Sequence, residues 1–144
     1  MDIREITPSY AVSPQIHPDD CQAIADAGFT TLICNRPDAE IPSDLSADVM
    51  EAAATAAGLA FVRLPVTHQT LTADIVAAQR DALDDAAGPV LAYCASGTRS
   101  SIVWSLGQAG DMASDDIIAA TGKVGYDLRG LHPQLETLAA QRKG

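Results

Sequence analysis

The residues best suited to carry out chemistry are the six at positions 94–99, where four small residues separate a cysteine from an arginine, Cys94-Ala-Ser-Gly-Thr-Arg99. The apolar run 89–93 precedes this segment and a helical pattern follows it, so the order is buried strand, tight loop, helix. The first N–H groups of a helix have no partner within the helix and, with the helix dipole, attract negative charge. A cysteine at that point is stabilised as a thiolate, and an arginine can hold two oxygens of one anion. The sequence therefore predicts an anion-binding loop with a nucleophilic sulfur.

The other loop residues are expected to supply binding groups. Gly97 permits a backbone conformation that a side chain would resist, and small neighbours leave the backbone amides free to turn inward. The alternative is that Cys94 is an inert buried thiol and Arg99 a surface cation. That interpretation would be preferred for an isolated cysteine, but the strand, loop and helix around Cys94 favour a functional one. We expect Cys94 and Arg99 to be catalytic, and we expect the anion to be bound by Ala95, Ser96, Gly97, Thr98 and Ser100.

The loop resembles the active-site loop shared by cysteine-dependent phosphatases and rhodanese-type sulfurtransferases. Tyrosine and dual-specificity phosphatases carry five residues between Cys and Arg, whereas four is the rhodanese-like spacing. Over nearly the whole chain the sequence is similar to a bacterial family, the beta-lactamase hydrolase-like, phosphatase-like domain, some members of which are labelled sulfurtransferases. The resemblance implies a fold of the dual-specificity phosphatase type. It rests on four segments in order, YAVSPQI (10–16), NRPD (35–38), LPV (64–66) and YCASGTRSS (93–101).

Strands and helices alternate along the chain. Apolar or β-branched runs predict strands at residues 10–13, 30–34, 60–64 and 90–93. Apolar periodicity and capping residues predict helices at 19–27, 46–57, 72–87, 100–109, 117–122 and 133–141. This alternation predicts parallel pairing through crossovers, and so an α/β fold with a parallel sheet and helices on both faces. Ligands bind at the carboxyl ends of the strands in such sheets, and Cys94 follows one of those ends.

The same sheet edge is expected to carry the segments after the second and third predicted strands, with Arg36, Asp38 and His68 as walls or as a proton donor. Arg36 is either a second anion contact or the partner of Asp38 or Glu40, a pairing that would fix its own loop. His68 is either an acid near neutral pH or an exposed loop residue. Cys34, at the end of the second predicted strand, either packs in the core or acts as a resolving thiol for Cys94.

Length and composition limit the class of protein. A chain of 144 residues predicts a single phosphatase-like domain over residues 1–144. The formal net charge of −10 argues against a nucleic-acid partner, because neutralising phosphates requires an excess of Lys and Arg. No apolar run approaches the roughly 20 residues that span a bilayer, and the first residues do not read as a signal peptide. The three cysteines form neither a paired framework nor a CxxC spacing. We therefore expect a cytoplasmic protein with no membrane partner, metal or cofactor, and the oligomeric state stays open.

Three functions fit these residues. In a phosphatase-like hydrolase, Cys94 attacks phosphorus. Residues 65–70 contain no Asp or Glu where dual-specificity phosphatases place their general acid, so Asp38 or His68 would have to donate the proton. In a sulfurtransferase or persulfide carrier, Cys94 attacks a sulfane sulfur, and that step needs no acid. The third alternative is a module that binds an anion or reports oxidation of Cys94. The expected ligand is a small anionic or sulfane-sulfur substrate.

Overall fold

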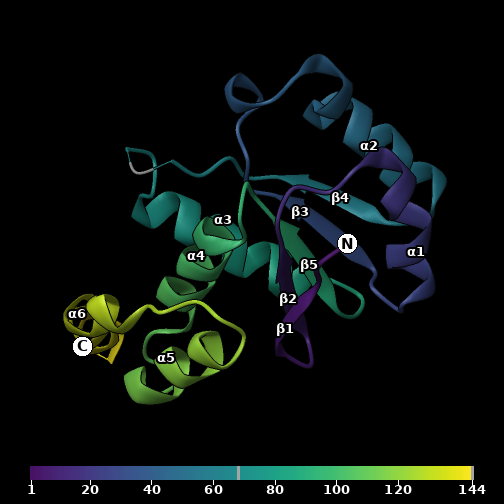
Figure 1. The fold of residues 1–144 in the computed structure, drawn as a ribbon. Coiled ribbons are helices and arrows are strands. Elements are labelled where there is room, and N and C mark those ends of the chain that lie inside the picture. The colour runs from purple at the N-terminus through teal and green to yellow at the C-terminus, as the bar shows by residue number, and fades with distance from the viewer. Residues whose placement is uncertain (68, 144) are drawn as a thin grey trace.

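A five-stranded sheet forms the centre of the computed structural model, which describes residues 1–67 and 69–143 (Figure 1). Its strand order is β1-β2-β5-β3-β4. The bounds are β1 Arg4–Thr7, β2 Tyr10–Ser13, β3 Thr31–Cys34, β4 Ala60–Arg63 and β5 Val90–Tyr93. The pairs β2–β5, β5–β3 and β3–β4 are parallel. Every residue of β2, β3 and β5 is buried, as expected for parallel strands covered on both faces, and the four predicted strands are confirmed.

The remaining strand, β1, is not predicted by the sequence pattern. It is antiparallel to β2, with Arg4 opposite Val12 and Glu5 opposite Ala11, so the sheet is mixed and not wholly parallel. Ile6 is the one buried residue of β1, which lies at the edge of the sheet. A single apolar residue among polar ones gives no periodicity from which a strand can be predicted.

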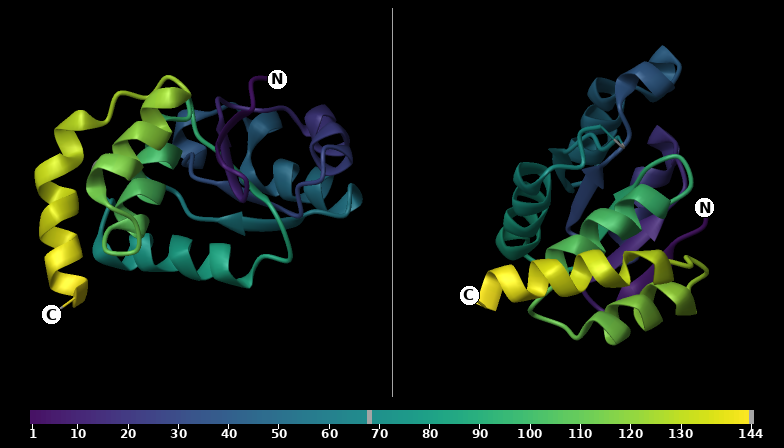
Figure 2. Two further views of the ribbon diagram at one scale, coloured as in Figure 1. Left: turned by 90° about the horizontal axis from the view of Figure 1, so that it is seen from below. Right: turned by 90° about the vertical axis from the view of Figure 1, so that its left-hand side faces the viewer.

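Within the described residues, six α-helices cover the sheet. They are α1 Cys21–Asp26, α2 Ala47–Ala56, α3 Ala73–Asp85, α4 Thr98–Gln108, α5 Ser114–Lys123 and α6 His132–Lys143. α1 and α2 pack on one face and α3 and α4 on the other, with α5 and α6 against α4 (Figures 1 and 2). All six lie where helices are predicted, although α4 begins two residues and α5 three residues earlier than expected. Among residues 1–67 and 69–143, no helix combines the length and the apolarity needed to cross a membrane.

Side-chain caps fix the start of α2 and of α3. The hydroxyl of Ser46 accepts a hydrogen bond from the Val49 N–H, and that of Thr72 accepts one from the Ile75 N–H, each at 3.3 Å. Such a cap stabilises a helix by about 1 kcal/mol. Since the loops after β3 and β4 lead into these helices, the caps anchor both loops at their far ends.

One apolar cluster on each face of the sheet holds the layers together. On the other side from α1 and α2, Trp104 of α4 is 3% exposed and stacks on Tyr10 of β2, with ring centroids 5.9 Å apart. Burying a large apolar side chain contributes about 1.5–3 kcal/mol, so these clusters fix α4 against the sheet. Fully buried members are Ile24, Leu32, Met50 and Leu91 in one cluster, and Val12, Ile33, Val103 and Ile117 in the other.

Candidate functional site

Cys94 lies in the loop that joins β5 to α4, at the carboxyl edge of the sheet (Figure 1). Its backbone N–H donates to the carbonyl oxygen of Ser13 at 3.4 Å, which extends the pairing of β2 and β5 by one residue. The side chain is fully buried, and its Sγ accepts a hydrogen bond from the Gly97 N–H at 3.1 Å. The sulfur therefore lies at the first turn of α4, where helix amides and the helix dipole favour a negative charge.

Position 97 of the loop requires glycine. Gly97 is the N-cap of α4 and has a φ of +91°, a left-handed conformation that glycine adopts without steric cost. A Cβ at this position would lie 2.1 Å from the hydroxyl oxygen of Tyr126. That hydroxyl donates a hydrogen bond to the carbonyl oxygen of Ser96 at 2.9 Å. Only a residue without a side chain lets Tyr126 approach the loop this closely.

Two further contacts hold the outer part of the loop. The Gln15 N–H donates to the carbonyl oxygen of Ala95 at 3.3 Å, and the Ser96 hydroxyl donates to Thr98 Oγ1 at 2.9 Å. The residues predicted to bind an anion are therefore brought together in one short turn around the Cys94 sulfur.

A buried polar network lies beneath this turn. The Ser100 hydroxyl donates to Asn35 Oδ1 at 2.9 Å, and Asn35 Nδ2 donates to Gln79 Oε1 at 3.1 Å and to the carbonyl oxygen of Leu64 at 2.9 Å. Gln79 Nε2 in turn donates to the Tyr10 hydroxyl at 2.9 Å. Because buried polar groups destabilise the fold when unpaired, the network fixes the N-terminus of α4 relative to the sheet and to α3.

Arg99 is held by a carboxylate from the loop after β3. Its Nη1 and Nη2 donate to the two carboxylate oxygens of Glu40, both at 2.7 Å, and Nη1 also donates to the carbonyl oxygen of Val66 at 2.9 Å. Hydrogen bonding to Glu40 raises the pKa of Arg99, burial opposes that rise, and the nearby Cys94 adds to it. Hydrogen bonding to Arg99 lowers the pKa of the Glu40 carboxyl in return. Both members of the pair therefore stay charged.

Arg36, a predicted wall residue, joins the same cluster. Its Nε donates to Glu40 Oε1 at 3.3 Å, and its Nη1 donates to Gln15 Oε1 at 3.2 Å. This geometry matches the interpretation in which Arg36 pairs with a nearby carboxylate and fixes its own loop. The Glu40 carboxylate lies between two guanidinium groups.

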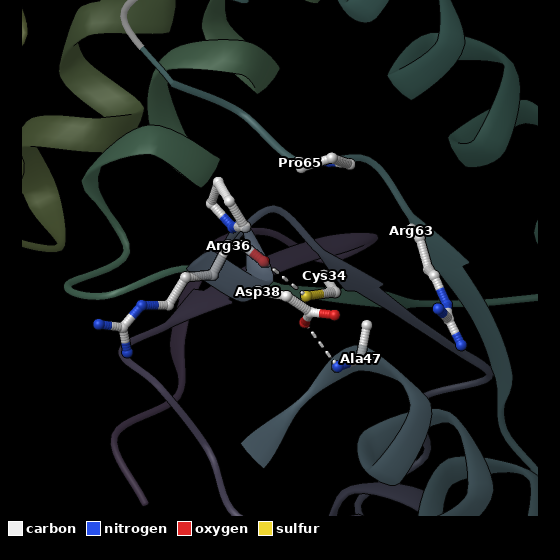
Figure 3. Close-up of a pocket in the computed structure, with 7 residues that line it drawn as sticks. Cys34, Arg36, Asp38, Ala47, Arg63 and Pro65 are labelled. Atoms are coloured by element: carbon white, nitrogen blue, oxygen red, sulfur yellow. Dashed lines mark hydrogen bonds between the residues drawn. The ribbon is translucent and has the colours of Figure 1, made fainter. Parts of the chain in front are cut away.

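Asp38, one of the two predicted proton donors, makes a structural contact. Its Oδ1 accepts a hydrogen bond from the Ala47 N–H at 2.8 Å, at the start of α2 (Figure 3). This hydrogen bond holds the Asp38 side chain at the start of α2. His68, the other predicted donor, lies outside the described residues.

Cys34 and Cys94 leave the sheet on different sides. The register pairs Cys34 with Tyr93, and side chains alternate between the faces along a strand, so Cys94 leaves on the face opposite to Tyr93 and Cys34. Cys34 is 3% exposed within the cluster on the α1 and α2 face, and burial raises the pKa of its thiol. All three cysteines are free thiols. The arrangement favours core packing of Cys34 over a role as resolving thiol.

Three residues of the site carry no local pattern in the sequence: Glu40, Tyr126 and Gln79. They lie 59, 30 and 44 residues from Arg99, Ser96 and Asn35, which they contact. The sequence offers Glu40, with Asp38, as a partner for Arg36, but it gives no sign of the contact between Glu40 and Arg99. Within residues 1–67 and 69–143, no group of three or more His, Cys, Asp and Glu side chains is placed to hold a metal ion.

The strand order and the parallel strands β2-β5-β3-β4, with helices on both faces, form an α/β fold of the dual-specificity and tyrosine phosphatase type. Solved structures agree. The crystal structure of a candidate phosphatase from Neisseria meningitidis superimposes with a TM-score of 0.83 at 33% identity, over 96% of this chain and 99% of that one. Tk-PTP in its active form superimposes with a TM-score of 0.69 at 16% identity, over 97% of each chain, which shows the shared fold.

The chain belongs to the family described as beta-lactamase hydrolase-like protein, phosphatase-like domain, whose model matches residues 2–111. A beta-lactamase hydrolase-like protein of Xylella fastidiosa (strain 9a5c) is 37% identical over 144 residues, covering 98% of this chain and 33% of that protein. This chain spans about a third of the length of that relative. The family and the fold implied by the sequence are both confirmed.

Proposed function

We propose that this protein is a hydrolase of the phosphatase type in which Cys94 is the nucleophile and Arg99, with the amides of residues 95–100, binds the phosphoryl group. The main support is the hydrogen bond of 3.1 Å from the Gly97 N–H to Cys94 Sγ at the N-terminus of α4. An amide that donates to sulfur stabilises the thiolate, which is the reactive form. Membership of the phosphatase-like family adds a second line of support.

The proposed reaction consists of two displacements at phosphorus. The Cys94 thiolate attacks, an S–P bond forms as the P–O bond to the leaving group breaks, and the leaving oxygen takes a proton from solvent. Water then attacks the cysteinyl phosphate, the S–P bond breaks, and phosphate is released as the thiolate is restored. In both steps the loop amides and Arg99 would stabilise the charge on the three equatorial oxygens.

The leaving group of such a substrate has to be a good one. Residues 65–70 contain no Asp or Glu, Asp38 is hydrogen-bonded to Ala47, and Arg99 lowers the pKa of Glu40. A general acid typically contributes a factor of about 10² to 10⁴ to the rate. We therefore expect hydrolysis of aryl phosphates, whose leaving oxygen departs without a proton, and much slower hydrolysis of alkyl phosphates.

Hydrolysis of p-nitrophenyl phosphate by Cys94→Ser, with Cys21→Ala as matched control, tests the nucleophile. Cys21 is buried in α1, in the cluster on the other side from α4. Cys94→Ser should lower kcat/KM by at least about 10³-fold, because the nucleophile is lost. Cys21→Ala should leave kcat/KM within about threefold, since its effect is on packing alone. Hydrolysis by Cys94→Ser at the wild-type rate would overturn the proposal.

Sulfur transfer is the second candidate, and the four-residue spacing between Cys94 and Arg99 favours it. The thiolate would attack the outer sulfur of thiosulfate, one S–S bond forming as another breaks to release sulfite. The persulfide on Cys94 would then pass its outer sulfur to an acceptor thiol. Intact-mass measurement after incubation with each substrate separates the two chemistries, because one adds a phosphoryl group to Cys94 and the other adds one sulfur atom.

A further inference from the structure

The peptide unit that joins Ser96 to Gly97 is hydrogen-bonded at both of its ends. Its N–H, the Gly97 amide, donates to Cys94 Sγ at 3.1 Å, and its carbonyl oxygen, on Ser96, accepts the hydrogen bond of 2.9 Å from the Tyr126 hydroxyl. The C=O and N–H of a planar trans peptide point in opposite directions, so a group that holds the carbonyl also fixes where the N–H points. Tyr126 is therefore linked to the Cys94 sulfur through a single peptide unit.

The backbone alone does not determine which way this peptide unit faces. Rotating it changes mainly ψ of Ser96 and φ of Gly97, and glycine adopts negative φ about as readily as the +91° found here. In the reversed orientation the carbonyl oxygen of Ser96 would face the sulfur, and its partial negative charge would repel a thiolate. The hydrogen bond from Tyr126 opposes this rotation, because the rotated carbonyl would leave the hydroxyl without its acceptor.

Two elements outside the loop fix the Tyr126 side chain, which is 6% exposed. The Tyr126 N–H donates to the carbonyl oxygen of Thr121, in the last turn of α5, at 3.0 Å. The guanidinium of Arg4, in β1, lies over the ring at 5.1 Å from its centroid, and its Nη1 donates to the carbonyl oxygen of Val124 at 3.2 Å. The hydroxyl is thus held in place by α5 and β1 together.

The Tyr126 hydroxyl also strengthens the hydrogen bond to sulfur. A peptide whose carbonyl accepts a hydrogen bond is polarised, and its N–H becomes a better donor, so successive hydrogen bonds reinforce one another. This effect favours the thiolate over the thiol, because hydrogen bonds to an ionised acceptor are stronger than those between neutral groups. Burial raises the pKa of Tyr126, so its hydroxyl keeps the proton that it donates.

We propose that Tyr126 is a positioning residue for the nucleophile: its hydroxyl holds the peptide between Ser96 and Gly97 with the N–H directed at Cys94 Sγ, and so keeps Cys94 in the reactive thiolate form. This inference rests on the proposed function, in which that thiolate attacks, and it adds a group that maintains the thiolate. Tyr126 lies beyond residues 2–111, the part of the chain that the family model matches, so the family resemblance does not include it.

The pH dependence of Cys94 alkylation by iodoacetamide measures the thiolate without any phosphatase turnover. The proteins are wild type, Tyr126→Phe and, as matched control, Tyr93→Phe, and the modified peptide that contains Cys94 is quantified by mass spectrometry. Tyr93 points to the opposite face of the sheet, and its hydroxyl has no hydrogen-bond partner among the described residues. Tyr126→Phe should move the midpoint of the alkylation profile upward by about one pH unit, a tenfold loss of thiolate below both midpoints. Tyr93→Phe should leave the midpoint at its wild-type value.

Hydrolysis of p-nitrophenyl phosphate adds a readout that a loss of stability alone would not produce. At pH values below both alkylation midpoints, kcat/KM of Tyr126→Phe should be about tenfold lower than that of wild type. The two values should converge as the pH rises above the midpoints, because Cys94 then ionises in both proteins. A loss by the same factor at every pH would contradict the positioning role.

Nuclear magnetic resonance of wild type tests the inference without any variant. The amide signal of Gly97 should shift with pH at the alkylation midpoint of Cys94, because this N–H donates to the sulfur that ionises. In Tyr126→Phe the shift should be smaller. A wild-type Gly97 signal that does not respond to ionisation of Cys94 would overturn the inference even if Tyr126→Phe did not fold.

The outcomes also separate this inference from the proposed function. An unchanged alkylation midpoint in folded Tyr126→Phe would overturn the positioning role of Tyr126 and leave the proposed hydrolase intact. Hydrolysis by Cys94→Ser at the wild-type rate would overturn the proposed function and, with it, any role of Tyr126 in the reaction, whatever the alkylation profiles show.

Discussion

Substituting Gly97 by alanine should destabilise the protein through one identifiable neighbour, Tyr126. The added Cβ would lie 2.1 Å from the Tyr126 hydroxyl oxygen and 2.9 Å from its ring carbon Cζ, so the ring has to move. Arg4 limits that movement, because its guanidinium lies over the ring at 5.1 Å from the centroid. Displacement of the ring breaks the hydrogen bond from Tyr126 to Ser96.

The expected loss has two parts. An alanine held at a φ of +91° costs about 1–2 kcal/mol, and a lost hydrogen bond costs about 0.5–1.5 kcal/mol. Gly97→Ala should therefore lower the free energy of unfolding by roughly 1.5–3.5 kcal/mol, measured by urea denaturation. Gly122→Ala is the matched control: Gly122 lies in α5 and its Cβ would meet nothing within 4 Å. Because alanine is the better helix former, that control should be neutral or stabilising by up to about 1 kcal/mol.

A double-mutant cycle shows whether Tyr126 is the cause. Tyr126→Phe alone removes the hydrogen bond to Ser96 and should cost about 0.5–1.5 kcal/mol. In the Gly97→Ala background that hydrogen bond is already broken, and removing the hydroxyl removes the closest overlap, so the same change should be neutral or stabilising. The two substitutions should thus couple by about 1 kcal/mol or more. Losses that add to within about 0.5 kcal/mol would refute the steric account of Gly97.

Three further predictions concern the residues around the loop. Asn35→Leu leaves the buried Ser100 hydroxyl and Gln79 amide without Asn35, so it should lower the free energy of unfolding by about 1–3 kcal/mol in urea. Asp38→Ala removes the hydrogen bond from the Ala47 N–H, so it should lower the free energy of unfolding by about 0.5–2 kcal/mol and leave the pH profile of aryl phosphate hydrolysis unchanged. If the substitution abolished the fall in rate at the basic end of that profile, Asp38 would be the proton donor after all. Hydrogen bonding to Arg99 lowers the pKa of Glu40 in the folded protein. The ion pair therefore stabilises the fold at pH values above the pKa of Glu40 in the unfolded chain, and this stabilisation is lost as the pH falls through the pKa of Glu40 in the folded protein. The stability difference between wild type and Glu40→Gln should therefore shrink from pH 6 to pH 3, and a constant difference would contradict this.

The parts of the fold that the sequence predicts are those set by neighbouring residues. The strand 90–93, the loop from Cys94 and the helix after it follow from local periodicity and small-residue spacing, and the structure has them in that order. The helix predicted from residue 72 is present and is capped by Thr72, a local contact because a cap acts within one turn. β1 escaped prediction because its single buried residue, Ile6, gives no pattern, and its pairing with β2 is what makes it a strand.

The contacts that shape the site depend on distant residues and could not be derived in this way. Arg99 is predicted as an anion ligand, but its pairing with Glu40 requires the loops after β3 and β5 to meet at the same sheet edge. The sequence offers Asp38 as a proton donor because it is a carboxylate near that edge. Its side chain instead accepts from the Ala47 N–H, nine residues away, a contact that exists only once α2 has docked.

The charge around the loop also limits the substrate. A chain with a formal net charge of −10 repels anions at long range, but salt screens exposed charges beyond about 8 Å at physiological ionic strength. Near Cys94 the two guanidinium groups of Arg36 and Arg99 share the single carboxylate of Glu40, so this cluster keeps one net positive charge. Together with the amides at the N-terminus of α4, that charge favours one phosphoryl group.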